Sequence, residues 1–233
     1  MTGCLANSLN VCLAWISTQM GNDLFNSSMQ SFGLGHPTGI DLAEEAAGRL
    51  KLPGDGDWYP VDLGTNAFGQ GVAVTPIQML MAASALANNG QMTYPHLVYA
   101  EVRDGHQSNM SPRVVGTPIS ADTAHTITEM LANALETESS GALVPGYRIA
   151  GKTGTAQVPT AFGYYDENKV NASFIGWGPV ADPRFLVYVW LENPTSNQAA
   201  SVVAAPIFQS VVEKLIVLLG IPPDSVVAQA AGR

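Results

Sequence analysis

Apolar residues recur three or four positions apart in five stretches of the chain, a spacing that predicts amphipathic helices. These stretches are residues 5–20, 23–32, 76–86, 120–135 and 202–219. Pro76 suits the first position of a helix that Asn88-Asn89-Gly90 would end, and Gly220 would end the last helix. We therefore expect helices to be the main regular elements as far as Leu135, with one short strand at Leu97 to Arg103.

The pattern changes after Glu136, where three stretches rich in β-branched and aromatic residues follow one another. They are Arg148 to Val158, Asn171 to Trp177 and Arg184 to Leu191. Turn-forming residues separate them, so we expect three consecutive antiparallel strands closed by the last helix. Helices followed by strands predict the α+β class. Residues 36–71, rich in Gly, Pro and Asp, are expected to form a long irregular segment, a kind that often carries function.

The composition narrows the class of protein. Of the 233 residues, 46% are hydrophobic, which suffices for a buried core. Only 12% are charged, about half the ~25% of ordinary domains. The net charge of −9 argues against a nucleic-acid-binding protein, which needs a basic surface to meet phosphates. Neither His-x-x-x-His nor Cys-x-x-Cys spacing occurs, so we expect no metal site and no cofactor.

The cysteines and the apolar runs say little about the cellular compartment. Cys4 and Cys12 would lie about 12 Å apart on one helix, too far for a disulfide, so we expect two thiols. No run reaches the ~18 apolar residues that span a bilayer. The first basic residue is Arg49, so we expect no signal sequence and no membrane anchor within the chain.

The densest group of candidate functional residues lies in the first predicted strand, at Gly151-Lys152-Thr153-Gly154-Thr155-Ala156. Glycine weakens a strand and often marks close approach by a ligand. Alternation puts Thr153 and Thr155 on one face and Lys152 on the other. Lys152 can then join the threonines only on an edge strand, where its long stem can wrap round. The alternative is a surface lysine on a twisted edge strand.

A second candidate is Ser8-Leu9-Asn10. Residues two apart on a helix point to different sides, so Ser8 and Asn10 can act together only in the turn before a helix. The alternative is that they cap the helix that follows.

Five short segments carry a family resemblance when they are taken together and in order. They are Ser8-Leu9-Asn10, 32–42, 69–78, 152–156 and 172–177. Together they resemble the transpeptidase domain of penicillin-binding proteins, of the class B, monofunctional type. That family is defined by three motifs, Ser-x-x-Lys, Ser-x-Asn and Lys-Thr-Gly. Ser8 with Asn10 match the second motif, and Lys152-Thr153-Gly154 match the third.

The resemblance implies catalytic roles for three residues. Ser8 would relay a proton toward the leaving group, and Asn10 would hydrogen-bond the amide of the acyl donor. Lys152 would hold positive charge near Ser8 and near the carboxylate of the substrate. In the family these groups assist a serine that attacks the penultimate D-Ala carbonyl of a peptidoglycan stem peptide.

The resemblance implies substrate binding for three further residues. Thr153 and Thr155 would bind the substrate carboxylate, and the backbone N–H of Thr155 would supply half of the oxyanion hole. Gly154 would leave room for a substrate strand lying antiparallel to its own. The implied partners are stem peptides ending in D-Ala-D-Ala, the β-lactams that mimic them and, for the full-length parent, a membrane glycosyltransferase of cell-wall synthesis; no nucleic acid is expected.

The first family motif is absent, because no serine in the chain is followed by lysine three residues on. In the family that motif lies several tens of residues upstream of Ser-x-Asn, so we expect an N-terminally truncated domain. The expected fold is the penicillin-binding and β-lactamase-like transpeptidase fold, an antiparallel sheet packed with helices, lacking its first strands and nucleophile helix. Residues 1–222 would be the C-terminal part of that domain, and residues 223–233 a short flexible tail.

These expectations give one leading function and two alternatives. The leading function is part of a peptidoglycan D,D-transpeptidase that crosslinks stem peptides through a serine acyl-enzyme. One alternative is a D,D-carboxypeptidase or β-lactamase-like hydrolase of the same superfamily, and the other is a non-catalytic cell-wall scaffold module. We expect the parent to be an enzyme of cell shape or division on the extracytoplasmic face of the cell membrane, and this chain alone to be inactive.

Overall fold

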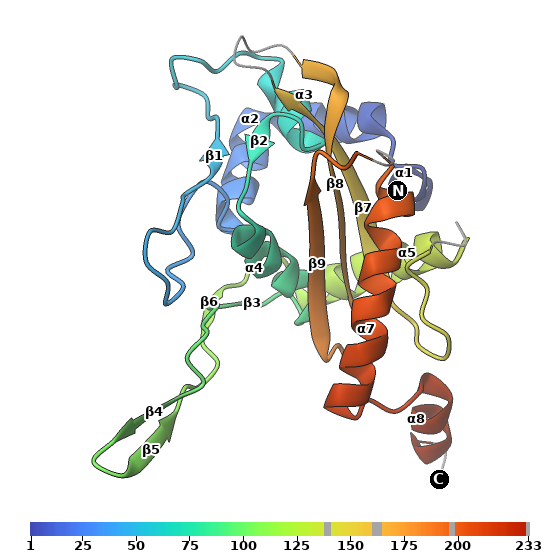
Figure 1. The fold of residues 1–233 in the computed structure, drawn as a ribbon. Coiled ribbons are helices and arrows are strands. Elements are labelled where there is room, and N and C mark those ends of the chain that lie inside the picture. The colour runs from blue at the N-terminus through green and yellow to red at the C-terminus, as the bar shows by residue number, and fades with distance from the viewer. Residues whose placement is uncertain (138–140, 160–164, 196–198, 232–233) are drawn as a thin grey trace. The chain divides into compact units, whose positions relative to one another are not determined.

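The computed structural model describes residues 1–137, 141–159, 165–195 and 199–231 (Figure 1). The chain forms two compact units. Unit 1 comprises Met1–Leu9 with His125–Arg233, and unit 2 comprises Asn10–Ala124. Each unit has a hydrophobic cluster of its own.

A three-stranded antiparallel sheet is the framework of unit 1 (Figure 1). Its strands are β7 (Ala150–Pro159), β8 (Tyr165–Gly178) and β9 (Phe185–Glu192), in that spatial order. Both neighbouring pairs are antiparallel, which confirms the predicted meander. The helices of this part are α1 (Thr2–Ala6), α5 (Ala121–Thr137) from His125 onward, α6 (Ala200–Val203), α7 (Ala205–Leu219) and α8 (Asp224–Ala231).

One face of the sheet packs against α7, which runs along it (Figure 1). Phe174 of β8 and Phe208 of α7 are fully buried, and their ring centroids lie 4.6 Å apart. Gly176 makes room for this contact, because a Cβ there would come within 2.7 Å of the Phe208 ring. Gly220 ends α7 in a left-handed conformation, as the sequence predicts. This core fixes the sheet that carries the candidate site.

Replacing Phe208 with alanine is expected to lower the free energy of unfolding by about 3–5 kcal/mol, because it removes a fully buried ring and leaves a cavity. Urea-induced unfolding followed by circular dichroism measures this loss. Ile207→Ala is the matched control, since Ile207 lies next in the same helix with 43% of its surface exposed. Equal losses for the two variants would contradict this assignment of the core.

The C-terminal residues are tied to the start of β7. The backbone N–H of Arg148 donates to Asp224 Oδ2 at 2.6 Å, and the N–H of Asp224 donates to the carbonyl of Gly146 at 3.0 Å. Residues 224–231 form α8, while the domain boundary at residue 222 and the flexible tail over residues 223–233 stay predictions.

One stretch of the described chain, Ala200–Ala230, is long and apolar enough to cross a membrane. By that measure the expectation that no segment qualifies is wrong. In the structure, however, the stretch is divided into α6, α7 and α8, and Phe208, Val212 and Ile216 are buried in the core of unit 1. Its apolar character is therefore accounted for in part by packing against the sheet.

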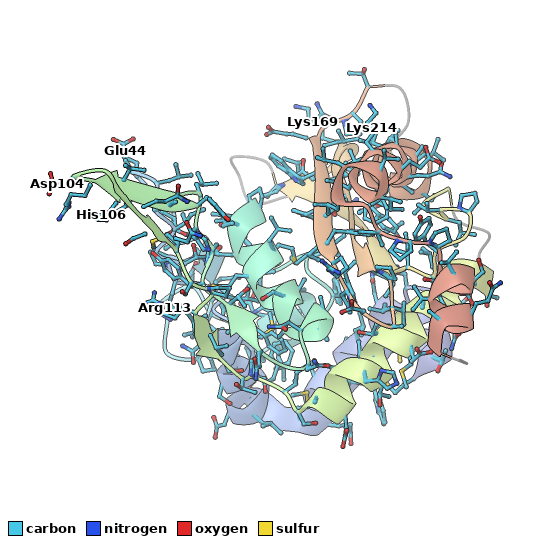
Figure 2. The ribbon with its side chains drawn as sticks, turned by 90° about the horizontal axis from the view of Figure 1, so that it is seen from below. Glu44, Asp104, His106, Arg113, Lys169 and Lys214 are labelled. Carbon is cyan, nitrogen blue, oxygen red and sulfur yellow. The ribbon has the colours of Figure 1, made fainter. Side chains whose placement is uncertain are left out.

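Unit 2 holds α2 (Asn10–Ser31), α3 (Asp62–Ala67), α4 (Pro76–Ala87) and six short strands. The strands pair as β1 (Arg49–Leu50) with β2 (Val72–Ala73), β3 (Met92–Thr93) with β6 (Val114–Gly116), and β4 (Ala100–Arg103) with β5 (His106–Asn109). The backbone of α2 kinks at Gly21, where the gap between the first two predicted helices lies. Asp104 and His106 lie at the tip of the β4–β5 hairpin (Figure 2).

Gln78, fully buried at the start of α4, organises the long irregular segment. Its backbone N–H and side-chain oxygen complete a capping box with Thr75, which explains why the helix starts at Pro76. Its side-chain amide donates to the carbonyls of His36 at 2.6 Å and Ala47 at 2.7 Å. One side chain thus supplies polar partners to backbone groups 31 and 42 residues away in the chain.

The prediction of one helix over residues 5–20 is wrong near its start. α1 ends at Ala6, and Ser8 adopts a φ of 51°, a left-handed conformation that interrupts a right-handed helix. α2 begins only at Asn10. Cys4 and Cys12 therefore do not share one helix, and both are disulfide-bonded, so the expectation of two thiols is also wrong. The apolar spacing continues through residues 7–9 and hides the break.

Candidate active site

The candidate site is built on the outer edge of β7. Among the described strands, β7 pairs with β8 alone, so its other edge carries backbone groups that no described strand takes up. In register, Lys152 faces Ile175 and Gly154 faces Ser173. An open strand edge can accept a peptide substrate as an additional strand.

Lys152 reaches the same side of the strand as its neighbour. Its Nζ donates to Thr153 Oγ1 at 3.1 Å and approaches the Thr153 carbonyl at 3.4 Å, and both side chains are half-buried. The sequence predicts this contact only for an edge strand, because the aliphatic stem of Lys152 must pass around the open edge of the strand to reach Thr153. The ammonium and the hydroxyl together form a site that favours a carboxylate.

The other lysines lie elsewhere. Lys51 is ion-paired with the buried Asp62 in unit 2. Lys169 and Lys214 are exposed on β8 and α7 of unit 1 (Figure 2). Lys152 is the lysine that the structure places beside threonine on β7. Among the described residues, no three His, Cys, Asp or Glu side chains gather as metal ligands would.

Gly154 and Thr155 complete the β7 segment. A Cβ on Gly154 would come within 2.7 Å of Ser173 Oγ, so the neighbouring strand supplies its own reason for glycine at this position. Thr155 is exposed on the same strand. Thr155 therefore offers an exposed hydroxyl and a backbone N–H. Gly154, the residue before it, has no side chain that would obstruct them. The roles of Thr153, Gly154 and Thr155 in substrate binding stay predictions.

Ser8 lies in the turn between α1 and α2. The sequence predicts that Ser8 and Asn10 can act together only if Ser8 lies in such a turn before a helix. Its N–H donates to the Leu5 carbonyl at 3.2 Å, and the Leu9 N–H donates to the Cys4 carbonyl at 3.1 Å. Both Ser8 and Asn10 are exposed. Ser8 belongs to unit 1, as do the β7 residues, whereas Asn10 is the first residue of unit 2. The roles of Ser8 and Asn10 stay predictions.

A polar cluster fixes the start of β7. Arg148 Nη1 donates to both Glu129 carboxylate oxygens at 2.8 and 2.9 Å. Its Nη2 donates to Asn133 Oδ1 at 2.7 Å and its Nε to Glu136 Oε1 at 3.0 Å. These three side chains lie on α5. The cluster therefore holds the strand four residues before Lys152 and gives Glu129 and Asn133 a structural role.

Tyr188 of β9 lies close to the candidate site but is not among the residues predicted from the sequence. It hydrogen-bonds Ser173, and burial raises its pKa above the ordinary value of 10.0 by more than that hydrogen bond lowers it. Alternation alone gives the face of Tyr188 within its own strand. The register between β8 and β9, which places it near Ser173, is not visible in the sequence.

Known proteins match this chain over almost its whole length. The model of the penicillin binding protein transpeptidase domain matches residues 1–213. Stage V sporulation protein D of Bacillus subtilis strain 168 is 37% identical over 93% of this chain and 34% of the relative. Peptidoglycan D,D-transpeptidase FtsI of Escherichia coli K12 is 28% identical over 97% of this chain and 37% of the relative. The chain thus spans about a third of the length of these relatives.

A solved structure supports the same grouping. Penicillin-binding protein 3 of Mycobacterium tuberculosis, crystallised with ampicillin, is 31% identical and superposes with a TM-score of 0.85. The match covers 96% of this chain and 52% of that protein. The expected fold, with an antiparallel sheet packed with helices, is confirmed by this superposition. The chain belongs to the penicillin-binding protein transpeptidase domain family.

Proposed function

We propose that this chain supplies the Ser-x-Asn and Lys-Thr-Gly part of a class B peptidoglycan D,D-transpeptidase. The observation that carries the proposal is the half-buried Lys152 ammonium, held 3.1 Å from the Thr153 hydroxyl on an open strand edge. A stem peptide ending in D-Ala-D-Ala has an extended backbone for that edge and a terminal carboxylate for this pair. β-Lactams carry an equivalent carboxylate.

The chemistry follows from where charge develops. A serine from a Ser-x-x-Lys segment attacks the penultimate D-Ala carbonyl, the bond to terminal D-Ala breaks, and the leaving amine takes a proton through Ser8. The Thr155 N–H stabilises the oxyanion of the intermediate. The amine of a second stem peptide then attacks the ester, which forms the crosslink and frees the serine. Asn10 holds the amide of the acyl donor during both steps.

We place this reaction at the outer face of the cytoplasmic membrane, where stem peptides are crosslinked. A membrane glycosyltransferase is the proposed partner, because crosslinking needs glycan strands as they are made. The relatives named for sporulation and for FtsI support a role in cell shape or division.

The test uses the extended protein, defined as this chain joined at its N-terminus to a penicillin-binding protein segment that carries the family's Ser-x-x-Lys motif. We expect fluorescent penicillin to label it covalently, with ampicillin competing. A label that persists for hours fits a transpeptidase, whereas rapid loss by hydrolysis would favour the β-lactamase-like alternative. An extended protein that melts cooperatively yet takes no label would overturn the proposal and favour the scaffold alternative.

A further inference from the structure

The β4–β5 hairpin of unit 2 presents an open and exposed strand edge (Figure 1). Among the described strands, β4 pairs with β5 alone, so no described strand lies beside its outer edge. Asp104 and Gly105 form the turn, and both have a positive φ, 52° and 77°, as a two-residue type I′ turn requires. Residues 101–109 are all exposed, and Val102 exposes 71% of its surface. An edge of this kind can pair with a further strand.

The hydrogen-bond pattern of the hairpin decides which backbone groups face this edge. In an antiparallel pair, hydrogen-bonded and non-hydrogen-bonded pairs of residues alternate. The N–H of Met110 donates to the Tyr99 carbonyl at 2.9 Å, so the backbone groups of Tyr99 face β5. Counting along β4, those of Glu101 and Arg103 also face β5, and Val102 lies between them in a non-hydrogen-bonded pair. The N–H and the C=O of Val102 therefore point out from the open edge.

The side chains of β4 make this edge self-complementary. Glu101 and Arg103 lie on one face of the strand and Val102 on the other, because side chains alternate. Both charged side chains are exposed, and within the described part of the chain neither forms an ion pair. When a second β4 runs antiparallel with the two Val102 residues opposite each other, each Glu101 lies directly opposite the Arg103 of the other copy. Two opposite-charge pairs then flank an apolar contact.

The same edge disfavours other antiparallel registers. Sliding one strand by one residue sets the outward backbone groups of one copy against groups of the other copy that face β5. Sliding it by two residues brings Glu101 opposite Glu101, or Arg103 opposite Arg103, and like charges directly opposite are destabilising. Only the register centred on Val102 satisfies both the backbone and the charges.

We propose that the β4 edge is a contact surface for a second copy of this chain, with the two strands antiparallel about a twofold axis at Val102. The two Val102 residues exchange N–H···O=C hydrogen bonds, so the same patch serves both copies. The contact is weak, because one short strand buries far less than the ~1,200–2,000 Å² of a stable interface. It forms where copies are held close together, since tethering raises their effective concentration.

A single thiol on the edge tests this pairing. Both native cysteines are disulfide-bonded, so Val102→Cys introduces the one free thiol. The Cα atoms of a hydrogen-bonded pair lie about 5.5 Å apart, which a disulfide spans. Mild oxidation of the purified chain should give a crosslinked dimer on a non-reducing gel. Gln107→Cys is the matched control, since Gln107 is the exposed partner of Val102 on β5. Equal rates for the two variants would mean random collision and would refute the contact.

Reversing the charges tests the register. In the Val102→Cys protein, Glu101→Arg or Arg103→Glu alone sets like charges opposite each other in both pairs, and each should lower the initial crosslinking rate about fivefold or more. The two reversals together should restore the rate, because opposite charges face each other again. A mixture of the two single variants, one of them carrying a mass tag, should crosslink between variants faster than within either. Additive losses in the doubly reversed protein would overturn the proposal.

The extended protein separates a second copy from a segment that covers the edge. Crosslinking of Val102→Cys should persist there, with the same response to charge reversal. If crosslinking occurs in this chain but is lost in the extended protein, the joined segment covers β4 and the proposal is wrong. None of these measurements uses penicillin, so their outcome does not depend on the proposed function.

Discussion

Replacing Lys152 with alanine in the extended protein should lower the second-order rate constant of acylation by fluorescent penicillin about 10²- to 10³-fold, the loss expected for one group that stabilises the transition state. The ammonium lies at the open edge of β7, 3.1 Å from the Thr153 hydroxyl and half-buried. Under the proposed function, alanine removes the positive charge that attracts the β-lactam carboxylate and that faces the charge developing at the reacting carbonyl. Arginine at this position keeps the charge but not its place, so it should restore only part of the rate.

Lys169→Ala and Lys214→Ala are the matched controls for this prediction. Both lysines are exposed in unit 1, on β8 and α7, and each substitution removes the same charge as Lys152→Ala (Figure 2). Neither should change the acylation rate beyond about twofold, because exposed charges in water interact weakly at a distance. A similar loss in all three variants would mean that net charge acts on penicillin, and the role given to Lys152 would be wrong.

The sequence predicted the three strands of unit 1 and the end of α7 because their determinants are local. The three strands are marked by β-branched runs and by turn residues, and Gly220 ends α7 where the pattern requires. The contact between Lys152 and Thr153 was also foreseeable, since it depends on one strand lying at an edge. Such features need no knowledge of which residues face one another across strands.

What the sequence missed depends on register and on single backbone angles. Ser173 and Tyr188 meet only because β8 and β9 pair in one register, and no local pattern encodes it. Ser8 interrupts the first predicted helix because its φ is 51°. Residues other than glycine seldom adopt this left-handed conformation, so a serine in the sequence does not predict a break. The apolar spacing around it continues as in a helix. The break also separates the two cysteines into different helices, which the expectation of two thiols did not allow for.

Purified alone, this chain should take no covalent label from fluorescent penicillin under conditions that label the extended protein fully. None of its serines is followed by lysine three residues on, so it carries no match to the family's nucleophile motif. Loss of a catalytic nucleophile costs on the order of 10⁶ in rate, and the remaining groups cannot form the acyl bond in its place. The measurement is in-gel fluorescence after boiling in detergent, which leaves only covalent label.

The serine to watch in this experiment is Ser8, because it is exposed in a turn and belongs to the unit that carries Lys152. If the chain alone is labelled and Ser8→Ala abolishes the label, Ser8 is itself a nucleophile and the proton-relay role is wrong. In the extended protein the two roles separate again. Alanine at the serine of Ser-x-x-Lys should abolish labelling, whereas Ser8→Ala should slow it about 10²- to 10⁴-fold, the range for lost proton transfer. A relay and a nucleophile at Ser8 thus predict opposite results for the same pair of variants.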